Sequence, residues 1–199
     1  MMTLGQAHTD AEGFATLGRL YHAAVEASEL AVQVDCSAMT WCDANLAAAI
    51  QAIRYRLRAE HGKVLHLVRV PEATMDSLTA VGLFPAIRER RRTTIIPLRR
   101  FELAEGKGFA SYTQEHLGNK GLPTMSTAVR QRFFEGIDEL FQNAAIHSKS
   151  AMGVFASGQL FPRKDRLDFS IVDLGLGFPA VVRAGTGFSL SPHQPSTGQ

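Results

Sequence analysis

Residues 126–147 carry the pattern that most restricts how this chain can fold. Apolar residues recur there at three- and four-residue steps, which predicts an amphipathic helix about five turns long. The apolar stripe consists of Val129, Phe133, Ile137, Leu140, Phe141 and Ala144. Beside the stripe, four polar residues follow one another at four-residue intervals and so share one edge of the helix. They are Glu135, Glu139, Asn143 and His147, and such a row is also typical of the solvated side of a helix.

A strand, a turn and a second strand are predicted after this helix, over 152–156, 160–166 and 167–172. The second strand ends in the sequence DLGLG, at Asp173–Gly177. Glycines after a carboxylate at a strand end let the backbone turn sharply and pass close to a bound molecule. A strand followed by a glycine turn also explains the sequence without any ligand. The two patterns together, thirty residues apart, are more specific than either one alone.

The helix sequence ELFQNAAIHS, at Glu139–Ser148, resembles the asparagine box E-x-x-x-N-A-x-x-H of the GHKL superfamily. This superfamily includes gyrase, heat-shock chaperones, mismatch-repair ATPases, histidine kinases and anti-sigma-factor kinases. DLGLG is similar to its first glycine box, D-x-G-x-G. The resemblance covers residues 124–183. It implies a Bergerat-type α/β sandwich, in which helices cover one face of a mixed sheet and ATP is bound.

The resemblance implies a role for each matching residue. Asn143 supplies an oxygen to a Mg²⁺ ion that bridges the ATP phosphates, and hard cations prefer such ligands. Glu139, one turn earlier, orients or deprotonates the attacking water in hydrolytic members. Asp173 accepts a hydrogen bond from the adenine amine, and Gly175 and Gly177 let the backbone approach the nucleotide.

The sequence departs from the superfamily after the first glycine box. Only 22 residues follow Gly177, whereas other members continue with a lid over the nucleotide and a second glycine-rich box. Residues 184–199 are rich in Gly, Ser and Pro, a composition that favours disorder. We therefore expect a truncated member with a disordered tail. No helix with a phosphoacceptor histidine is recognisable ahead of the ATPase half, although His116 is available.

The first half alternates predicted strands and helices. Strands are expected over 31–34, 63–70 and 93–98, with helices between them, and an N-terminal extension with a helix precedes them over 1–27. This order predicts a small α/β layer with parallel strands. The strand at 63–70 is almost continuously apolar, which suits burial on both faces of the sheet.

The helix between the first two strands carries an apolar stripe formed by Leu46, Ile50, Ile53 and Leu57. Asp43 is in position to cap its start, and Gly62 is in position to end it.

Residues 28–101 resemble a STAS-like domain, the fold of anti-sigma-factor antagonists. The resemblance rests on the element order and on the sequence DCSAMTWCDANL at 35–46. Many members carry a phosphorylatable serine at the start of the helix that follows. This chain has Cys42-Asp43-Ala44-Asn45 there, without a hydroxyl group. A connecting region, 102–123, separates this half from the ATPase-like half.

Composition narrows the possible partners. The net charge of +2 is too small to indicate nucleic-acid binding, and the arginines at 88–92 have no aromatic residues between them for base stacking. No apolar run approaches the ~20 residues of a membrane span, and the N-terminus lacks the pattern of a secretion signal. Cys36 and Cys42 have no second cysteine pair for a zinc site, so we expect buried thiols in a cytoplasmic protein.

These patterns predict an ATP-binding regulatory protein that uses Mg-ATP for protein phosphorylation or for a nucleotide-dependent switch. We expect a protein partner to bind through the STAS-like half, and a homodimer stays open. The alternative is a non-enzymatic interaction module with a degenerate ATPase half. The intact Glu139, Asn143 and Asp173 favour the first hypothesis, and the missing lid favours the second.

We predict that a kinase of the anti-sigma type will not phosphorylate residues 36–46, because the hydroxyl at the helix start is absent. Ser37 and Thr40 lie within this stretch and carry the hydroxyl groups that a kinase could phosphorylate. The measurement is mass spectrometry after incubation with such a kinase and ATP. Stoichiometric phosphate on either residue would contradict the prediction.

Overall fold

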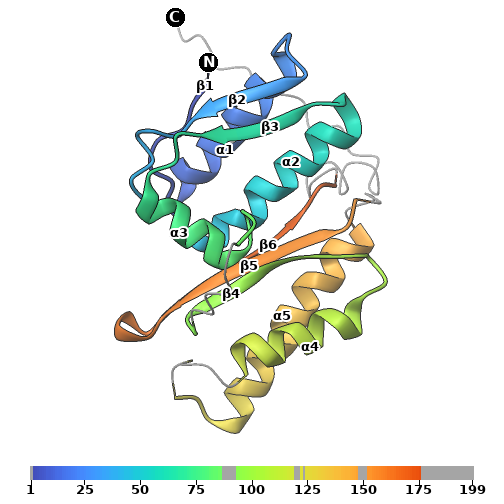
Figure 1. Ribbon diagram of the computed structural model, residues 1–199. Helices are drawn as coiled ribbons and strands as arrows, with labels where there is room; N and C mark the ends of the chain where they lie inside the picture. Colours follow the sequence, from blue (N-terminus) through green and yellow to red (C-terminus); the bar gives the residue numbers. More distant parts are fainter. Residues whose placement is uncertain (1, 87–92, 119–121, 123, 148–151, 176–199) are drawn as a thin grey trace, which may run out of the picture.

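The computed structural model describes residues 2–86, 93–118, 122, 124–147 and 152–175. The chain is an α/β protein with two three-stranded sheets, as Figure 1 shows. The first sheet is parallel and has the order β1 (Met2–Thr3), β2 (Ala31–Asp35), β3 (Val64–Val68). The second sheet is antiparallel and has the order β4 (Ile95–Phe101), β5 (Val154–Phe161), β6 (Arg166–Asp173).

Five α-helices accompany these sheets in the described part of the chain: α1 (Ala11–Glu26), α2 (Ala47–His61), α3 (Glu72–Val81), α4 (Gly106–Leu117) and α5 (Thr127–His147). Helices α2 and α3 lie between the two sheets, and α4 and α5 lie on the far side of the second sheet (Figure 1). A short 3-10 turn, η1 (Ala44–Leu46), leads into α2. The predicted α/β class, with parallel strands in the first half, is confirmed.

The helix predicted in the N-terminal extension is α1, and Asp10 caps it by accepting a 2.8 Å hydrogen bond from the Gly13 backbone N–H. Helix α2 ends at Gly62 as predicted, because Gly62 adopts the left-handed conformation with φ of 63°. The prediction that Asp43 caps this helix is wrong. Its carboxylate instead accepts hydrogen bonds from the Thr9 N–H at 2.7 Å and from Trp41 Nε1 at 2.9 Å. The Asp43 carboxylate therefore binds the N-terminal segment and does not cap the helix.

The third predicted strand does not join the first sheet. Strand β4 pairs antiparallel with β5, so it belongs to the second sheet. Its side chains alternate between the two cores: Ile95 packs in the core of the first half and Ile96 in the core of the second. The second sheet is antiparallel throughout its described strands, in place of the predicted mixed sheet. A hairpin through 162–165 joins β5 to β6 and imposes that direction.

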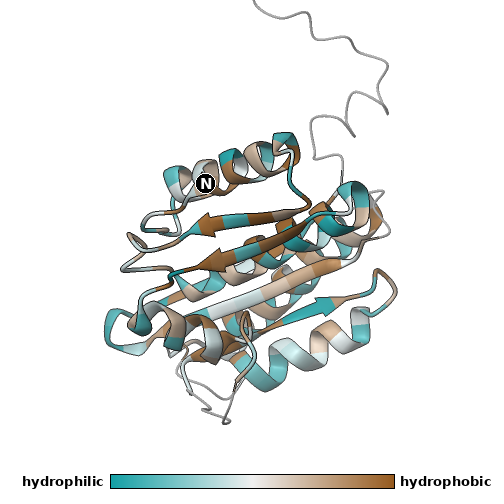
Figure 2. Ribbon diagram, turned by 45° about the horizontal axis from the view of Figure 1, so that its top comes forward, coloured by the Kyte–Doolittle hydropathy of each residue, from teal (hydrophilic) through white to brown (hydrophobic). Residues whose placement is uncertain are grey.

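Strand β3 is buried on one face only, which corrects the expectation of burial on both. Leu65 and Leu67 are buried, whereas Val64 and His66 are exposed. Helices α1, α2 and α3 contribute to the same core cluster as these two leucines, so the helices cover one face of the sheet. Apolar residues nevertheless predominate along both β2 and β3, as the hydrophobic colour in Figure 2 shows. The sequence of these strands therefore shows the alternation of buried and exposed positions only weakly.

Helix α2 is buried on two sides in its first half, because each side meets a different sheet. Ile50 and Leu57 pack with the first sheet, as the predicted stripe implied. Ala48 and Ala52 pack instead against Phe155 of the second sheet. Alanine has the smallest side chain that favours a helix, so this face can approach the second sheet closely.

Buried polar groups join the start of α2 to the second sheet. Asn45 is fully buried and donates a 2.9 Å hydrogen bond from Nδ2 to Ser170 Oγ on β6. Ser157 Oγ on β5 accepts a 3.0 Å hydrogen bond from the Ala48 backbone N–H and lies 2.9 Å from the carbonyl oxygen of Asn45. Each of these bonds satisfies a group that water cannot reach, so their geometry fixes where the helix starts on the sheet.

We predict that Asn45→Ala lowers the free energy of unfolding by about 1–3 kcal/mol, because Ser170 would keep a buried hydroxyl without its partner. Chemical denaturation measures the change, and Gln33→Ala, at an exposed position of β2, serves as the control. In a double-mutant cycle, Asn45→Ala and Ser170→Ala should lose less stability together than the sum of the single changes. Strict additivity of the two changes in the free energy of unfolding would contradict the hydrogen bond between Asn45 and Ser170.

Candidate functional site

Helix α5 presents the residues of the predicted asparagine box, and its own packing determines their direction. Phe134, Ile137 and Phe141 are buried against the second sheet and α4. Two residues of the predicted stripe are not buried: Val129 is 53% exposed and Leu140 is 59% exposed. The predicted apolar stripe is therefore wider than the buried face, because the main contacts of this helix among the described elements are with α4, β5 and β6.

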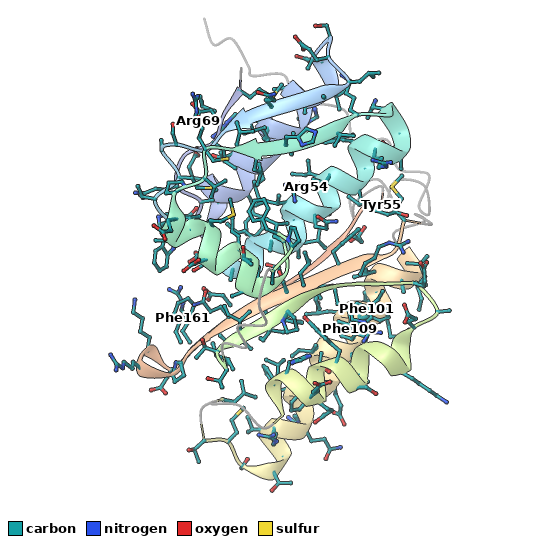
Figure 3. The ribbon with its side chains drawn as sticks, viewed as in Figure 1. Arg54, Tyr55, Arg69, Phe101, Phe109 and Phe161 are labelled. Carbon is teal, nitrogen blue, oxygen red and sulfur yellow. The ribbon has the colours of Figure 1, made fainter. Side chains whose placement is uncertain are left out.

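An aromatic cluster holds the C-terminal half of α5 in place. The ring of Phe141 stacks on Phe109 of α4 with centroids 4.4 Å apart, and Phe101 of β4 meets both rings edge-on. Figure 3 labels Phe101 and Phe109 at this contact. Such pairs restrict rotation of the helix about its axis as well as burying area. With Phe141 directed inward, Glu139 and Asn143 lie on the exposed part of the helix.

Asp173 is the last residue of β6, and its side chain is on the α5 face of the sheet. Side chains alternate between the two faces of a strand. Phe169 and Ile171 pack with the core under α4 and α5, whereas Val172 packs against α2. Asp173 is thus on the same face as Ile171. It is exposed, and its Oδ1 accepts a 2.8 Å hydrogen bond from the Gly175 backbone N–H.

Asp173 and Asn143 lie at the same end of the second sheet. In the sheet register Asp173 is opposite Val154, the first residue of β5. Strand β5 is the next element after α5, so the helix ends where β5 begins and β6 ends (Figure 1). Gly153 precedes β5 with φ of 81°, and a Cβ there would lie 2.4 Å from the carbonyl oxygen of Phe101. A glycine is required for this close approach.

Glu139 and Asn143 therefore lie in the C-terminal half of α5, the helix that packs on the Asp173 face of the second sheet and ends toward the end of β6 (Figure 1). Gly175 follows directly in the turn that Asp173 holds. Gly177 lies outside the described residues, as do the arginines at 88–92 and the predicted tail at 184–199.

Metal binding at this end would have to use few protein groups. In the described part of the chain, no three His, Cys, Asp or Glu side chains are grouped so that they could hold a metal ion. Asn143 offers one neutral oxygen ligand on an exposed helix face. Mg²⁺ commonly takes one or two protein ligands and completes its shell with phosphate oxygens and water. Among the described residues, this donor set would suit an ion that arrives with a nucleotide.

The segment at the start of α2, where the sequence comparison predicted the position of a phosphorylatable serine, is enclosed. Cys42, Asp43, Ala44 and Asn45 are all buried, since they lie between the N-terminal segment and the second sheet. Ser37 and Thr40 are exposed, and Thr40 Oγ1 accepts a 2.8 Å hydrogen bond from Gln6 Nε2. No phosphate could be attached at the helix start without separating the two layers.

A cavity of about 530 Å³ lies in the first half, and no residue of α5 or β6 is among its described lining residues. Arg54 and Arg58 of α2 line it. Their four-residue spacing is visible in the sequence, but a cationic helix edge is normally solvated, so it gave no reason to expect a cavity.

Comparisons with protein-family models, with curated proteins and with solved structures find no match for this chain. None of the helices in the described residues is both long enough and apolar enough to cross a membrane.

The two cysteines are buried, as expected, and their environment keeps them protonated. Burial raises the pKa of the Cys36 thiol to about 11 and that of Cys42 to about 12, and the charges of Asp35 and Asp43 add to the effect. The thiolate is the nucleophile, so neither residue is suited to nucleophilic catalysis near neutral pH.

We predict that both thiols react slowly with Ellman's reagent in the native protein at pH 8. A thiol whose pKa lies about three units above the pH of the solution is ionised to only about one part in 1000. The rate should rise about tenfold per pH unit while the fold persists. Unfolding in guanidinium chloride should release both thiols at full speed and provides the control. Rapid, stoichiometric labelling of either cysteine in the native state would contradict the prediction.

Proposed function

We propose that the second half of this chain provides a Bergerat-type site for an adenine nucleotide and Mg²⁺, and that the bound nucleotide regulates the protein. One observation carries the proposal: α5, which holds Asn143 in its last two turns, packs on the face of the second sheet that carries Asp173 and ends toward the same end of the sheet as β6 (Figure 1). The resemblance of the two sequence boxes requires this arrangement. The STAS-like nature of the first half and the GHKL membership belong to the same proposal.

The proposed roles follow from the chemistry of each side chain. Asn143 contributes an amide oxygen to the Mg²⁺ ion, which would neutralise phosphate charge when bound. Asp173 keeps one carboxylate oxygen beyond its bond to Gly175 and accepts from the adenine amine. Glu139, one turn before Asn143 and exposed, orients the water that attacks in a hydrolytic reaction. Gly175 and Gly177 leave room for the nucleotide close to the backbone.

Strand β6 supports a regulatory use of the nucleotide. One face of this strand carries Asp173, and the other carries Val172, which packs with Ala48 and Ala52 of α2. Ser170, three residues before Asp173, holds Asn45 at the start of α2. A nucleotide that shifts the end of β6 therefore acts on a strand that also holds the first half. The output would be protein phosphorylation or a switch in partner binding through the STAS-like half.

Exposed apolar side chains favour the second candidate function, a non-enzymatic interaction module. In the first half, Leu30 is 67% exposed and Trp41 is 48% exposed. On α5, Ile146 and Leu140 are exposed beside the box residues. Exposed apolar side chains mark a contact with another protein where they form a continuous patch. The two candidates differ in one measurable property, which is Mg²⁺-dependent nucleotide binding.

We predict weak, Mg²⁺-dependent binding of ATP or ADP, measured by calorimetry at millimolar nucleotide. Asn143→Ala should abolish the Mg²⁺-dependent part, because it removes the metal ligand. Asp173→Ala should lose the preference for ATP over GTP, since guanine lacks the exocyclic amine at that position. Glu139→Ala should leave affinity nearly unchanged and remove any residual turnover, because a group that acts only in the transition state affects rate.

Glu135→Ala is the matched control, since Glu135 lies on the same helix edge four residues before Glu139 and outside the box. Melting temperatures of all four variants separate binding from stability, and we expect each change to cost about 0.5 kcal/mol or less at these exposed positions. No heat of binding for any adenine nucleotide, or equal affinities for all variants, would contradict the nucleotide site and leave the interaction module.

A further inference from the structure

The cavity of about 530 Å³ lies between the C-terminal half of α2, the edge strand β3 and residues 83–85. None of Glu139, Asn143 and Asp173 lines it, so it is separate from the proposed nucleotide site. Figure 3 labels Arg54 and Tyr55, which reach it from successive positions of α2. Strand β3 ends the described part of the first sheet at this side, so the cavity lies along the strand's open edge.

The lining of this cavity is cationic. Arg54, Arg58 and Lys63 line it together with His66, and no aspartate or glutamate is among the described lining residues. Lys63 is already used, because its Nζ donates to the carbonyl oxygens of residues 24, 25 and 27 at the end of α1. The two arginines form no ion pair with any described residue. An excess of positive charge without carboxylates favours an anionic ligand.

Arg54 is held in place by uncharged groups. Its Nη1 donates a 3.3 Å hydrogen bond to the carbonyl oxygen of Leu83, and its guanidinium lies 5.4 Å from the centre of the Phe84 ring. Its Nε is shielded from solvent and has no hydrogen-bond partner. Burial lowers the pKa of this guanidinium, and no carboxylate of the described residues offsets that effect. A partly buried cation without a counter-charge costs free energy that a bound anion would recover.

Backbone amides add donors at the same edge. The Val64 N–H donates to the carbonyl oxygen of Leu30, toward β2. Because successive residues of a strand direct their amides to opposite sides, the N–H groups of Leu65 and Leu67 point away from β2. Both residues line the cavity. Such N–H groups beside two arginines can bind the oxygens of an anion.

Apart from Gln51, the remaining lining residues are apolar or aromatic. Leu83, Phe84 and Pro85 form one side, and Tyr55 lies on another. The Tyr55 ring is fixed by an edge-on contact with Phe155, with centroids 5.6 Å apart, and by Arg100, whose guanidinium lies 4.7 Å from the ring centre. Rigid apolar walls with a few convergent polar groups are characteristic of small-molecule sites.

We propose that this cavity binds a small organic anion. Its phosphate or carboxylate group is held by Arg54 and Arg58, and its apolar body packs against Phe84 and Tyr55. The site adds a second ligand to the protein and does not depend on the proposed nucleotide site.

Titration of the full chain with phenyl phosphate and with benzoate, followed by calorimetry, tests this proposal. Phenol, which has the ring without a full negative charge at neutral pH, is the matched neutral probe. We expect at least one anion to bind with a Kd of about 1 mM, and phenol to bind at least about tenfold more weakly. Which anion binds more tightly distinguishes a phosphate-bearing ligand from a carboxylate.

Variants on one helix locate the site. Arg58→Gln, at an exposed position, should weaken anion binding about tenfold without affecting the fold, and Arg54→Gln should weaken it at least as much. Arg56→Gln is the matched control, because Arg56 lies on the same helix, outside the cavity, and pairs with Glu60. It should change the Kd by less than about twofold. Asn143→Ala should leave phenyl phosphate binding unchanged, which separates this site from the nucleotide site.

Three results would each overturn the proposal. The first is no binding of either anion up to about 10 mM. The second is phenol binding as tightly as the anions. The third is an equal loss of affinity in Arg56→Gln and Arg58→Gln, which would show a general charge effect in place of a site.

Discussion

Helix α2 is packed between two sheets, and the arrangement of the other elements depends on this double burial. Its first half has apolar contacts on both sides, with Ile50 toward the first sheet and Ala48 and Ala52 toward Phe155 of the second. Small residues on one side and satisfied polar groups at the helix start favour such packing. The alanine-rich sequence supplies the first, and Ser157 with Asn45 and Ser170 supplies the second. In this chain the small residues let the second sheet approach α2 closely, and the hydrogen bonds satisfy the polar groups that this approach buries.

Strand β6 connects this packing to the candidate site. The alternation of a strand gives it two independent faces, one toward α2 and one toward α5. Asp173 is on the α5 face at the end of the strand, where α5 also ends. A ligand bound at that end would therefore contact one face of the strand, while the first half of the chain packs on the other. This arrangement gives the proposed regulation a physical route without requiring any further element.

Buried ionic groups in the first half are satisfied in two different ways. Lys63 donates to three carbonyl oxygens at the C-terminal end of α1, where the helix dipole favours a cation. Asp43 accepts from Thr9 and Trp41 and so ties the N-terminal segment to the start of α2. Arg54 differs from both, because neutral groups hold it and no carboxylate pairs with it among the described residues. That difference is what points to a ligand in the adjacent cavity.

Local sequence patterns determined the parts of this protein that depend on near neighbours. The helical period of apolar residues predicted α2 and α5, and Gly62 predicted the end of α2. The two sequence boxes indicated Glu139, Asn143 and Asp173 as candidate site residues. Strand pairing could not be obtained in this way, because a hydrogen bond between β4 and β5 joins residues more than fifty positions apart and leaves no local signal. The same holds for Asn45 with Ser170 and for the cavity beside Arg54. A side chain's periodicity shows that it faces a neighbour, and only the tertiary structure decides which neighbour that is.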